Sequence, residues 1–351
     1  LVANRLRKHI RKQDFVARYG SDEFIMVFSD LKDKENITSL IRNLFKRFEK
    51  PFLLSDGEIF ISISMGIAVY PDNGEKVQDL IQKAGFALMG AKRGGKNTFK
   101  FYTSKMNAKA LKRLEMETKL HKAIERENFL LYYQPQFDLN TNTLVGIEAL
   151  LRWNDPEKGL IAPSEFIPIA EESGLILQLG SWVLKQACMQ MKNWKDQGLL
   201  GFRVSVNISP LQFSQENFLD ILKKTIKETG VNGSDLMLEI TEGILMDDVE
   251  DTRKKLHAIK ALGCKLSIDD FGTGYSSLAY LRKFPIDELK IDKSFVLDLA
   301  YPDNASIVKT IISLAENLNM NVIAEGIEDN VQKEFLLKNK CNMMQGYLFG
   351  H

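Results

Sequence analysis

Short apolar runs and stretches of helical spacing alternate through the second two-thirds of the chain. Between most of the runs, apolar residues recur every three or four positions, as in Trp182–Trp194 and Ser306–Leu318, which predicts amphipathic helices. The runs themselves are expected to be strands, at Leu130–Leu139, Leu144–Trp153, Phe202–Ser209, Leu236–Thr241, Lys265–Asp270, Glu288–Asp292, Asn321–Gly326 and Met343–Phe349. Strands that alternate with helices in this way are typical of an α/β barrel.

The first of these strands is an exception. Only Asn140-Thr141-Asn142-Thr143 separates it from the second strand. A connection this short cannot hold the crossover that parallel neighbours need, so the first two strands should run antiparallel. We therefore predict an α/β fold, a modified (β/α)8 barrel of the TIM type whose first strand is reversed.

The N-terminal part follows a different, α+β pattern. Apolar runs at Asp14–Arg18 and Phe24–Phe28 flank Gly20-Ser21-Asp22, which is typical of a β-hairpin. The other expected elements of this part are helices at Ile37–Phe48 and Val77–Lys92 and a strand at Ile59–Tyr70. We assign residues 1–104 to this α+β part and residues 128–351 to the barrel.

A lysine-rich segment of helical spacing, residues 105–127, joins the two parts. Its apolar positions are Leu111, Leu114, Leu120 and Ile124. The charge run is either a solvated helix face between two domains or a basic docking surface. In either case the segment is a helical linker that leads into the barrel.

Composition restricts the partners and the compartment. Hydrophobic residues make up 44% of the chain, charged residues 26%, and the net charge is +1, so neither a DNA or RNA polymer nor an anionic membrane is favoured as a partner. The three cysteines are far apart and fit a reducing compartment. No apolar stretch could span a bilayer and no signal peptide opens the chain. We expect a cytoplasmic fragment of a longer protein, which a region upstream of Leu1 could tether to a membrane.

The strands carry polar residues near their ends, and alternation indicates that these residues face the barrel axis. In Val204–Ile208 the apolar side chains face the helices and Asn207 faces the axis. The same phase places inside the barrel Glu239, Thr241, Asp269, Lys290 and Asp292. The complete set of strand-end residues is Gln134, Glu148, Asn207, Glu239, Asp269, Asp270, Lys290, Glu325 and Gln345. Several acids at one barrel mouth would repel each other unless a positive charge lay among them.

The donor types indicate which ion this would be. Carboxylate and amide oxygens are hard donors that suit Mg²⁺ or Mn²⁺. The four histidines, His9, His121, His257 and His351, lie outside the strand-end set, which disfavours zinc. The adjacent acids Asp269 and Asp270 could serve two ions, and two ions about 3.5–4 Å apart are a standard arrangement for phosphoester hydrolysis.

The barrel sequence resembles the EAL-type cyclic-di-GMP phosphodiesterases. The similarity covers about Phe129 to His351. Its segments are Tyr133-Gln134-Pro135, Glu148-Ala149-Leu150-Leu151-Arg152-Trp153, Asn207-Ile208-Ser209, Glu239-Ile240-Thr241-Glu242, Asp269 through Ser277, Lys290-Ile291-Asp292, Ala324-Glu325-Gly326-Ile327-Glu328 and Gln345-Gly346-Tyr347. Eight segments in order, each at a strand end, are very specific, whereas the three letters EAL alone are not.

The resemblance implies a role for each matching residue. Glu148, Asn207, Glu239 and Asp269 would hold a first metal ion, and Asp269 would bridge to a second ion held with Asp270 and Glu325. A water between the ions would be the nucleophile, with Glu325 the candidate base and Lys290 orienting the water. Gln134, Arg152 and Tyr347 would contact the dinucleotide, Gln345 would lie at the metal–water site, and Glu242 would support the loop Asp269–Ser277.

The residues also permit other interpretations. Asp270 or Ser276 could cap the following helix, and Gly272 with Gly274 could form only a tight turn. Lys290 could be only a structural partner of an acid. Arg152 could be an ion pair at the rim, and Tyr347 could belong to the core. Glu242 falls on the opposite phase from Glu239, which favours loop support over metal ligation.

The N-terminal part resembles the GGDEF domain of diguanylate cyclases. The resemblance is carried by the turn Gly20, Ser21, Asp22, Glu23 and Phe24, by Ser62–Ala68, by Ala87–Lys92 and by Gly95-Lys96-Asn97. Ser21 occupies the place of the second glycine of the family's turn, which is a handicap if that position needs positive φ. The family's preceding metal-binding strand should lie upstream of Leu1, and Gly85 replaces a usual acid. We therefore expect a truncated, degenerate domain.

An RxxD pattern, Arg11 to Asp14, precedes the turn and in the family is an inhibitory product site. It could equally be a solvated ion pair. Either GTP or cyclic-di-GMP could bind this part of the chain.

Three hypotheses about function follow. The first is an enzyme that opens cyclic-di-GMP to linear pGpG with two Mg²⁺ or Mn²⁺ ions, works as a homodimer through the barrel, and is inhibited by Ca²⁺. The second is a catalytically silent cyclic-di-GMP receptor. The third is a cyclase activity in the N-terminal part, against which the missing upstream strand argues.

Overall fold

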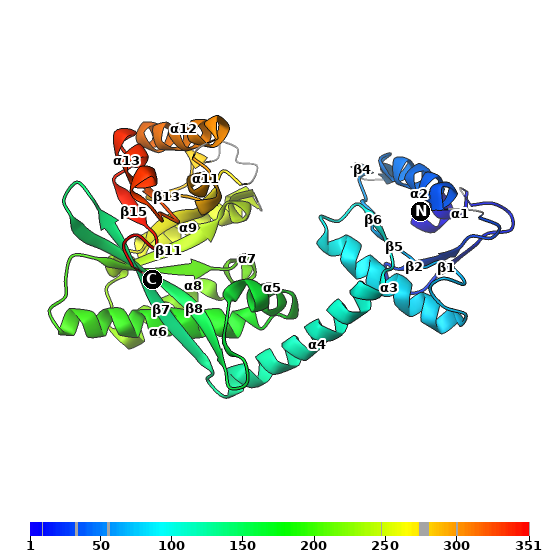
Figure 1. The fold of residues 1–351 in the computed structure, drawn as a ribbon, viewed down its shortest axis with the longest axis horizontal. Helices are drawn as coiled ribbons and strands as arrows, with labels where there is room; N and C mark the ends of the chain where they lie inside the picture. The colour runs from blue at the N-terminus through cyan, green and yellow to red at the C-terminus, as the bar shows by residue number, and fades with distance from the viewer. Residues whose placement is uncertain are drawn as a thin grey trace. The chain divides into compact units, whose positions relative to one another are not determined.

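The structure, a computed structural model, describes residues 1–8, 10–31, 34–54, 57–246, 248–273, 281–299 and 301–350. It divides into two compact units, Leu1–Glu115 and Met116–His351 (Figure 1). The division falls within one helix, α4 (Ser104–Glu125), which occupies the segment expected to be a helical linker. No helix of the described residues is long and apolar enough to cross a membrane.

The second unit is a closed eight-stranded barrel. Its strands are β7 (Phe129–Asp138), β8 (Thr143–Asp155), β10 (Arg203–Ile208), β11 (Leu236–Thr241), β12 (Lys265–Phe271), β13 (Glu288–Ile291), β14 (Asn321–Ala324) and β15 (Met343–Gln345). They follow each other from β10 to β15, then β7 and β8, and β8 pairs with β10 to close the barrel. β7 runs antiparallel to both of its neighbours, β8 and β15, whereas the other barrel pairs are parallel. The predicted barrel with a reversed first strand is confirmed.

Helices lie around these strands (Figure 1). They are α5 (Pro163–Ser173), α6 (Ile176–Asp196), α7 (Pro210–Ser214), α8 (Phe218–Thr229), α9 (Val249–Ala261), α11 (Lys293–Leu297), α12 (Pro302–Leu318) and α13 (Asn330–Lys338). The described residues also include the short strand β9 (Gly159–Ile161) and the 3-10 turns η1 (Gly233–Asp235) and η2 (Glu242–Met246). β9 pairs with the end of β8 and extends the first hairpin.

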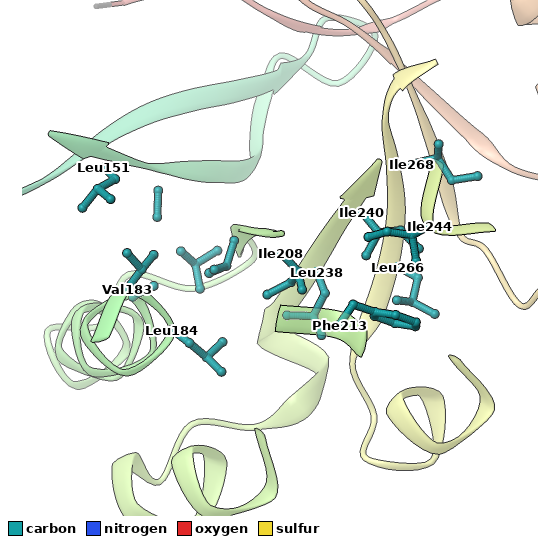
Figure 2. Packing of buried hydrophobic residues seen from close by; sticks show 14 of the residues in the cluster. Leu151, Val183, Leu184, Ile208, Phe213, Leu238, Ile240, Ile244, Leu266 and Ile268 are labelled. Atoms are coloured by element: carbon teal, nitrogen blue, oxygen red, sulfur yellow. The ribbon is translucent and has the colours of Figure 1, made fainter. Parts of the chain in front are cut away.

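The core lies between the strands and the helices. Figure 2 shows Ile208, Leu238, Ile240, Leu266 and Ile268 on neighbouring strands, and all of them are buried. Because side chains alternate along a strand, the residues between them point to the barrel axis. Burial of the apolar face against the helices therefore fixes which polar side chains meet inside the barrel.

The first unit contains three separate two-stranded pairings within the described residues. These are the hairpin β1 (Phe15–Arg18) with β2 (Phe24–Val27), β3 (Phe52–Leu54) with β4 (Gly57–Ile59), and parallel β5 (Met65–Ile67) with β6 (Phe99–Phe101). The helices are α1 (Val2–Arg7), α2 (Lys34–Phe48) and α3 (Val77–Arg93). The predicted hairpin and both predicted helices are confirmed.

The single strand predicted at Ile59–Tyr70 is wrong. Its two ends serve different partners, since β4 pairs with β3 and β5 pairs with β6, and the residues between them join neither ladder. Gly66 of β5 lies against α3, where an added Cβ would fall 2.0 Å from the carbonyl oxygen of Ala84. This close approach explains a glycine within a strand.

Candidate metal centre and active site

Lys290 lies at the centre of the polar barrel mouth. Its Nζ is 2.5 Å from Glu239 Oε2 and 2.6 Å from Glu325 Oε1. Asp269 Oδ1 follows at 3.0 Å and Glu148 Oε2 at 3.4 Å. The carboxylates come from β8, β11, β12 and the end of β14, while Lys290 lies on β13. The structure thus brings the predicted strand-end acids to one buried cation.

The surroundings of Lys290 keep it protonated. Burial alone would lower the pKa of its ammonium, because the charged form loses water. The facing carboxylates, led by Asp269 and Glu148, outweigh burial and hold the pKa of Lys290 well above its usual value. The lysine is therefore a fixed positive charge inside the barrel.

The acids around Lys290 respond to it unequally. Burial would raise the pKa of Glu148, but Lys290 and hydrogen bonds from Gln345 and Asn207 hold that pKa below its usual value. Burial and the neighbouring Glu148 raise the pKa of Glu239 well above its usual value, against the pull of Lys290. Burial also raises the pKa of Glu325 to about 8. One lysine does not supply enough positive charge for this many buried carboxylates.

Asp269, Asp270 and Glu325 form a second grouping. One carboxylate oxygen from each lies within 4.8 Å of the others, as a metal site requires. Asp270 has a φ of 52°, a left-handed value that aspartate adopts more readily than most residues, at the point where β12 ends. Burial and the adjacent Asp269 raise the pKa of Asp270 to about 6.

The donor set fits a hard divalent cation. Glu239 Oε1 is buried and has no hydrogen-bond partner among the described residues. Asp269 Oδ1 is also buried without a hydrogen bond there, although Lys290 Nζ is 3.0 Å away. Asn207 donates its Nδ2 to Glu148 Oε1 at 2.7 Å, which leaves the amide oxygen of Asn207 available. Buried oxygens without donors are costly unless a cation binds them.

The glutamines of the site form a connected network. Gln345 Nε2 donates to Glu148 Oε2 at 2.6 Å and to Gln134 Oε1 at 2.8 Å. Gln134 Nε2 in turn donates to the carbonyl oxygen of Gly350 at 3.3 Å. A further residue, Gln136, donates to Gln345 Oε1 at 2.9 Å. Sequence reasoning missed Gln136, although it lies two positions after Gln134 on β7 and therefore shares its inward phase.

The outer residues of the site lie at the rim. Arg152 donates to the carbonyl oxygen of Leu151 at 3.0 Å, and its guanidinium carbon lies 5.4 Å from the Tyr132 ring centroid. Whether Arg152 contacts a substrate or forms an ion pair at the rim stays a prediction. Tyr347 is 60% exposed, so its assignment to the core is wrong.

Glu242 is buried and supports the loop that follows β12. The backbone N–H of Gly272 donates to Glu242 Oε2 at 3.3 Å. Gly272 has a φ of 97°, which a glycine adopts without strain. The later loop positions, Gly274 to Ser277, lie outside the described residues.

Asp292 follows strand β13, which ends at Ile291, and is half-buried. It is the N-cap of α11, accepting from the N–H of Ser294 at 3.0 Å. Its side chain also interacts with Asp270 at the barrel mouth, where its negative charge helps to raise the pKa of Asp270. Thr241, which shares the inward phase of Glu239, is half-buried.

In the N-terminal unit, the RxxD residues form a local turn. Asp14 accepts from the backbone N–H of Arg11 at 2.9 Å and from that of Ser29 at 3.3 Å. The Arg11 side chain is exposed. Whether this turn binds a ligand stays a prediction.

The turn with the degenerate signature is a closed β-hairpin loop. Arg18 donates to the carbonyl oxygens of Gly20 and Ser21 at 3.0 and 2.7 Å. Ser21 Oγ is 3.3 Å from Asp22 Oδ1, and Glu23 pairs with Lys92 at 3.9 Å. Ser21 does not have a positive φ, so its Cβ causes no backbone strain in this conformation. Phe24 begins β2.

Comparison with known proteins agrees with this arrangement. Residues 117–351 match the EAL domain family, and residues 1–98 match the diguanylate cyclase GGDEF domain family. The chain is 41% identical over 350 residues to the bifunctional diguanylate cyclase/cyclic di-GMP phosphodiesterase MucR of Pseudomonas aeruginosa, which covers 99% of this chain and 51% of that protein. It is 37% identical over 350 residues to the cyclic di-GMP phosphodiesterase NbdA of the same species, with coverage of 99% and 45%.

Solved structures include a close relative of the barrel. The structure described as the PaMucR phosphodiesterase in complex with c-di-GMP is 43% identical, with a TM-score of 0.66, over 68% of this chain and 96% of that chain. The chain spans about half the length of the curated relatives it matches. With the barrel topology, the converging acids and the two domain matches taken together, this chain belongs to the EAL-type cyclic-di-GMP phosphodiesterase family and carries a GGDEF-family region ahead of its EAL domain.

Proposed function

We propose that this chain hydrolyses cyclic-di-GMP to linear pGpG and that the reaction requires Mg²⁺ or Mn²⁺. One observation carries the proposal: four carboxylates from different strands converge within 3.4 Å of one buried lysine, and some of their buried oxygens lack donors. The assigned metal ligands are Glu148, Asn207, Glu239, Asp269, Asp270 and Glu325. A catalytically silent receptor would have no need to maintain so many buried acids, whose desolvation is costly.

Hydrolysis adds one water across one phosphodiester bond of the cyclic dinucleotide. The water oxygen attacks phosphorus, the bond to the 3′ oxygen breaks, and that oxygen leaves as a hydroxyl. Bound divalent ions would supply positive charge that clamps the phosphate and lowers the pKa of the water. Glu325 is the assigned base, because one of its carboxylate oxygens lies within 4.8 Å of those of Asp269 and Asp270, where the attacking water would be held. Asp270, whose carboxylate lies beside that of Glu325, is assigned to help hold a metal ion there.

Lys290 is assigned to orient the attacking water and to offset the negative charge of the reacting phosphate. Its compact ammonium carries three donors and already faces Glu325 at 2.6 Å. Since this lysine is fixed before substrate binds, it needs little reorganisation during the reaction. It is not a metal ligand.

The rim residues are assigned to the substrate. Arg152 presents a guanidinium suited to a phosphate oxygen, and Gln134 presents an amide beside Gln345. The exposed ring of Tyr347 can stack on a guanine base. Glu242 contributes indirectly, since it holds the N–H of Gly272 in the loop that carries Asp270.

The test is incubation of the purified chain with cyclic-di-GMP and Mn²⁺ or Mg²⁺, followed by separation of the products. A matched pair of variants sharpens it. Glu239→Gln and Glu288→Gln each neutralise an inward acid that is 1% exposed, but Glu288 starts β13, at the opposite end of the barrel from the mouth. We expect linear pGpG from the parent and from Glu288→Gln, and almost none from Glu239→Gln.

The other hypotheses are outcomes of the same experiment. Tight binding of cyclic-di-GMP without product, with either ion, would favour the receptor. Consumption of GTP would indicate that the GGDEF-family region is an active cyclase. Equal activity of the two glutamine variants would contradict the assigned metal centre. Association of two barrels, which we also propose, is measured separately by sedimentation.

A further inference from the structure

We propose that Gln136 is a positioning residue that holds the Gln345 amide in place, and through it the orientation of Glu148. Gln136 lies on β7 and is 3% exposed. Its Nε2 donates to Gln345 Oε1 at 2.9 Å. The inference rests on the proposed function, because it assigns Gln136 to the support of that same site.

The hydrogen bonds of this network run in one direction. Glu148, when ionised, can only accept, so the Gln345 group that faces it must be the Nε2 donor, as observed at 2.6 Å. The Gln345 oxygen then points away from Glu148, and it needs a donor of its own. Gln136 supplies that donor. The Glu148 carboxylate thus selects the amide orientation of Gln345, and the outer hydrogen bond from Gln136 holds the amide in that position.

Strand register explains why Gln136 is in reach. Gln136 is the Cα partner of Gln345 on β15 and of Gly146 on β8. Its amide therefore lies between the two strands that flank β7. One level higher, Gln134 is the partner of Glu148, so the four polar side chains form two adjoining layers inside the barrel.

Gly146 provides the space that Gln136 occupies. A Cβ added at Gly146 would lie 2.1 Å from Gln136 Oε1, a contact that atoms cannot make. Gly146 does not have a positive φ, so the backbone does not require a glycine there. The requirement comes from the Gln136 amide. Gly146→Ala should therefore displace Gln136 without altering any proposed substrate or metal contact directly.

Loss of the Gln136 donor has a defined consequence. Without it, Gln345 Oε1 loses its donor, and the Gln345 side chain shifts toward another donor, which weakens its hydrogen bond to Glu148 Oε2. Glu148 then turns away from its position beside Lys290 and Asn207. We expect Gln136→Met to lower kcat about tenfold and to weaken Mn²⁺ binding several-fold, the effect of one hydrogen bond. Affinity for cyclic-di-GMP in Ca²⁺ should change less than about threefold, because Arg152 and Tyr347 are untouched.

The decisive experiment is a double-mutant cycle of Gln136→Met and Gln345→Leu in the full chain. It has two readouts, kcat with Mn²⁺ and Mn²⁺ affinity by calorimetry. If Gln136 acts through Gln345, then Gln136→Met changes either quantity by less than about twofold in the Gln345→Leu background. Multiplied losses in the double variant, or parent-like values for Gln136→Met alone, would overturn the proposal.

Two further variants separate positioning from folding. Gly146→Ala should lower kcat and weaken Mn²⁺ binding as Gln136→Met does. In a Gln136→Ala background, Gly146→Ala should have little added effect, because the shorter side chain leaves space for the new methyl group. Gln332→Met is the matched control: Gln332 is also buried and accepts from the N–H of Glu328, but it lies in α13. It should lower the melting temperature and leave kcat within about twofold. If the parent chain hydrolyses nothing, the proposed function fails, and the Mn²⁺ cycle still decides the role of Gln136.

Discussion

Lys290 Nζ lies 2.5 Å from Glu239 Oε2, and both side chains are almost completely excluded from water. This pair is a buried part of the candidate metal centre. Glu239 Oε1 has no hydrogen-bond partner among the described residues. A buried ion pair of this kind gives little net stability, but removal of one partner leaves an uncompensated charge. Removal of Lys290 should therefore destabilise the barrel more than removal of an exposed lysine would.

We predict that Lys290→Ala destabilises the metal-free barrel by about 3–5 kcal/mol, because several buried acids lose their cation. Saturating Mg²⁺ should restore more stability to the variant than to the parent, since the ion replaces the missing charge. Urea unfolding followed by tryptophan fluorescence measures this, and Trp153, Trp182 and Trp194 all lie in the barrel unit. Equal Mg²⁺ effects on both proteins would contradict the prediction.

The same variant tests the catalytic role of Lys290. With saturating Mg²⁺, Lys290→Ala should lower kcat strongly while the affinity for cyclic-di-GMP stays within about tenfold, because the lost interaction belongs mainly to the transition state. Lys290→Arg should not restore activity, since a planar fork cannot replace a compact ammonium. Calorimetry and single-turnover hydrolysis separate the two effects. Weak binding combined with a normal rate of the bound fraction would make Lys290 a substrate anchor.

Glu148→Ala and Asp269→Ala should each abolish hydrolysis. Both acids face Lys290 and belong to the proposed ligand set, so loss of either leaves the remaining oxygens unable to hold a cation in place. Product formation at limiting Mg²⁺ is the measurement. Turnover close to that of the parent in either variant would remove that residue from the metal centre.

Ca²⁺ should inhibit the proposed hydrolysis. It accepts the same oxygen donors as Mg²⁺ but is larger and tolerates looser geometry, so the water and the phosphate should be misaligned. Competition between Ca²⁺ and Mg²⁺ in an initial-rate assay measures this, with cyclic-di-GMP binding in Ca²⁺ as the control that the site is filled. Full activity with Ca²⁺ as the only divalent ion would contradict the mechanism.

The sequence predicts the barrel and most of its mouth because both depend on local alternation. Glu239 and Lys290 lie between apolar neighbours that must pack against helices, so their inward direction follows from the strand itself. Asp292 follows the same phase, and its side chain meets that of Asp270 at the mouth. Alternation did not predict that β13 ends before Asp292 or that Asp292 caps α11.

Long-range pairing sets the features that the sequence does not predict. The bond between Gln136 and Gln345 depends on the register of β7 against β15, whose partners are about two hundred positions apart. The split of the expected strand at Ile59–Tyr70 likewise reflects which strands are available as partners, and no local pattern encodes that choice.

The pH dependence of barrel stability should include a contribution from Asp287, which directly precedes β13 at the end of the barrel opposite the mouth. Asp287 precedes β13 and accepts from Lys260 Nζ at 2.7 Å, from Lys265 Nζ at 3.0 Å and from the N–H of Leu266 at 2.9 Å. Burial alone would raise the pKa of Asp287, but these donors hold the pKa below its usual value. A carboxylate with a lowered folded-state pKa stabilises the fold above its unfolded pKa of about 3.9, and that stability is lost as pH falls through the folded-state pKa.

Asp287→Asn should therefore lower the free energy of unfolding by about 1–3 kcal/mol at neutral pH, the range for hydrogen bonds to a charged group. The difference from the parent should stay constant down to about pH 5 and shrink as pH falls below about 4, where the parent carboxylate becomes protonated. Urea unfolding followed by tryptophan fluorescence at several pH values gives the difference directly. Glu250→Gln is the control, because Glu250 pairs with Arg253 on the exposed surface of α9 and should change stability little. A difference for Asp287→Asn that grows on acidification would show that the carboxylate is not held charged by its lysines.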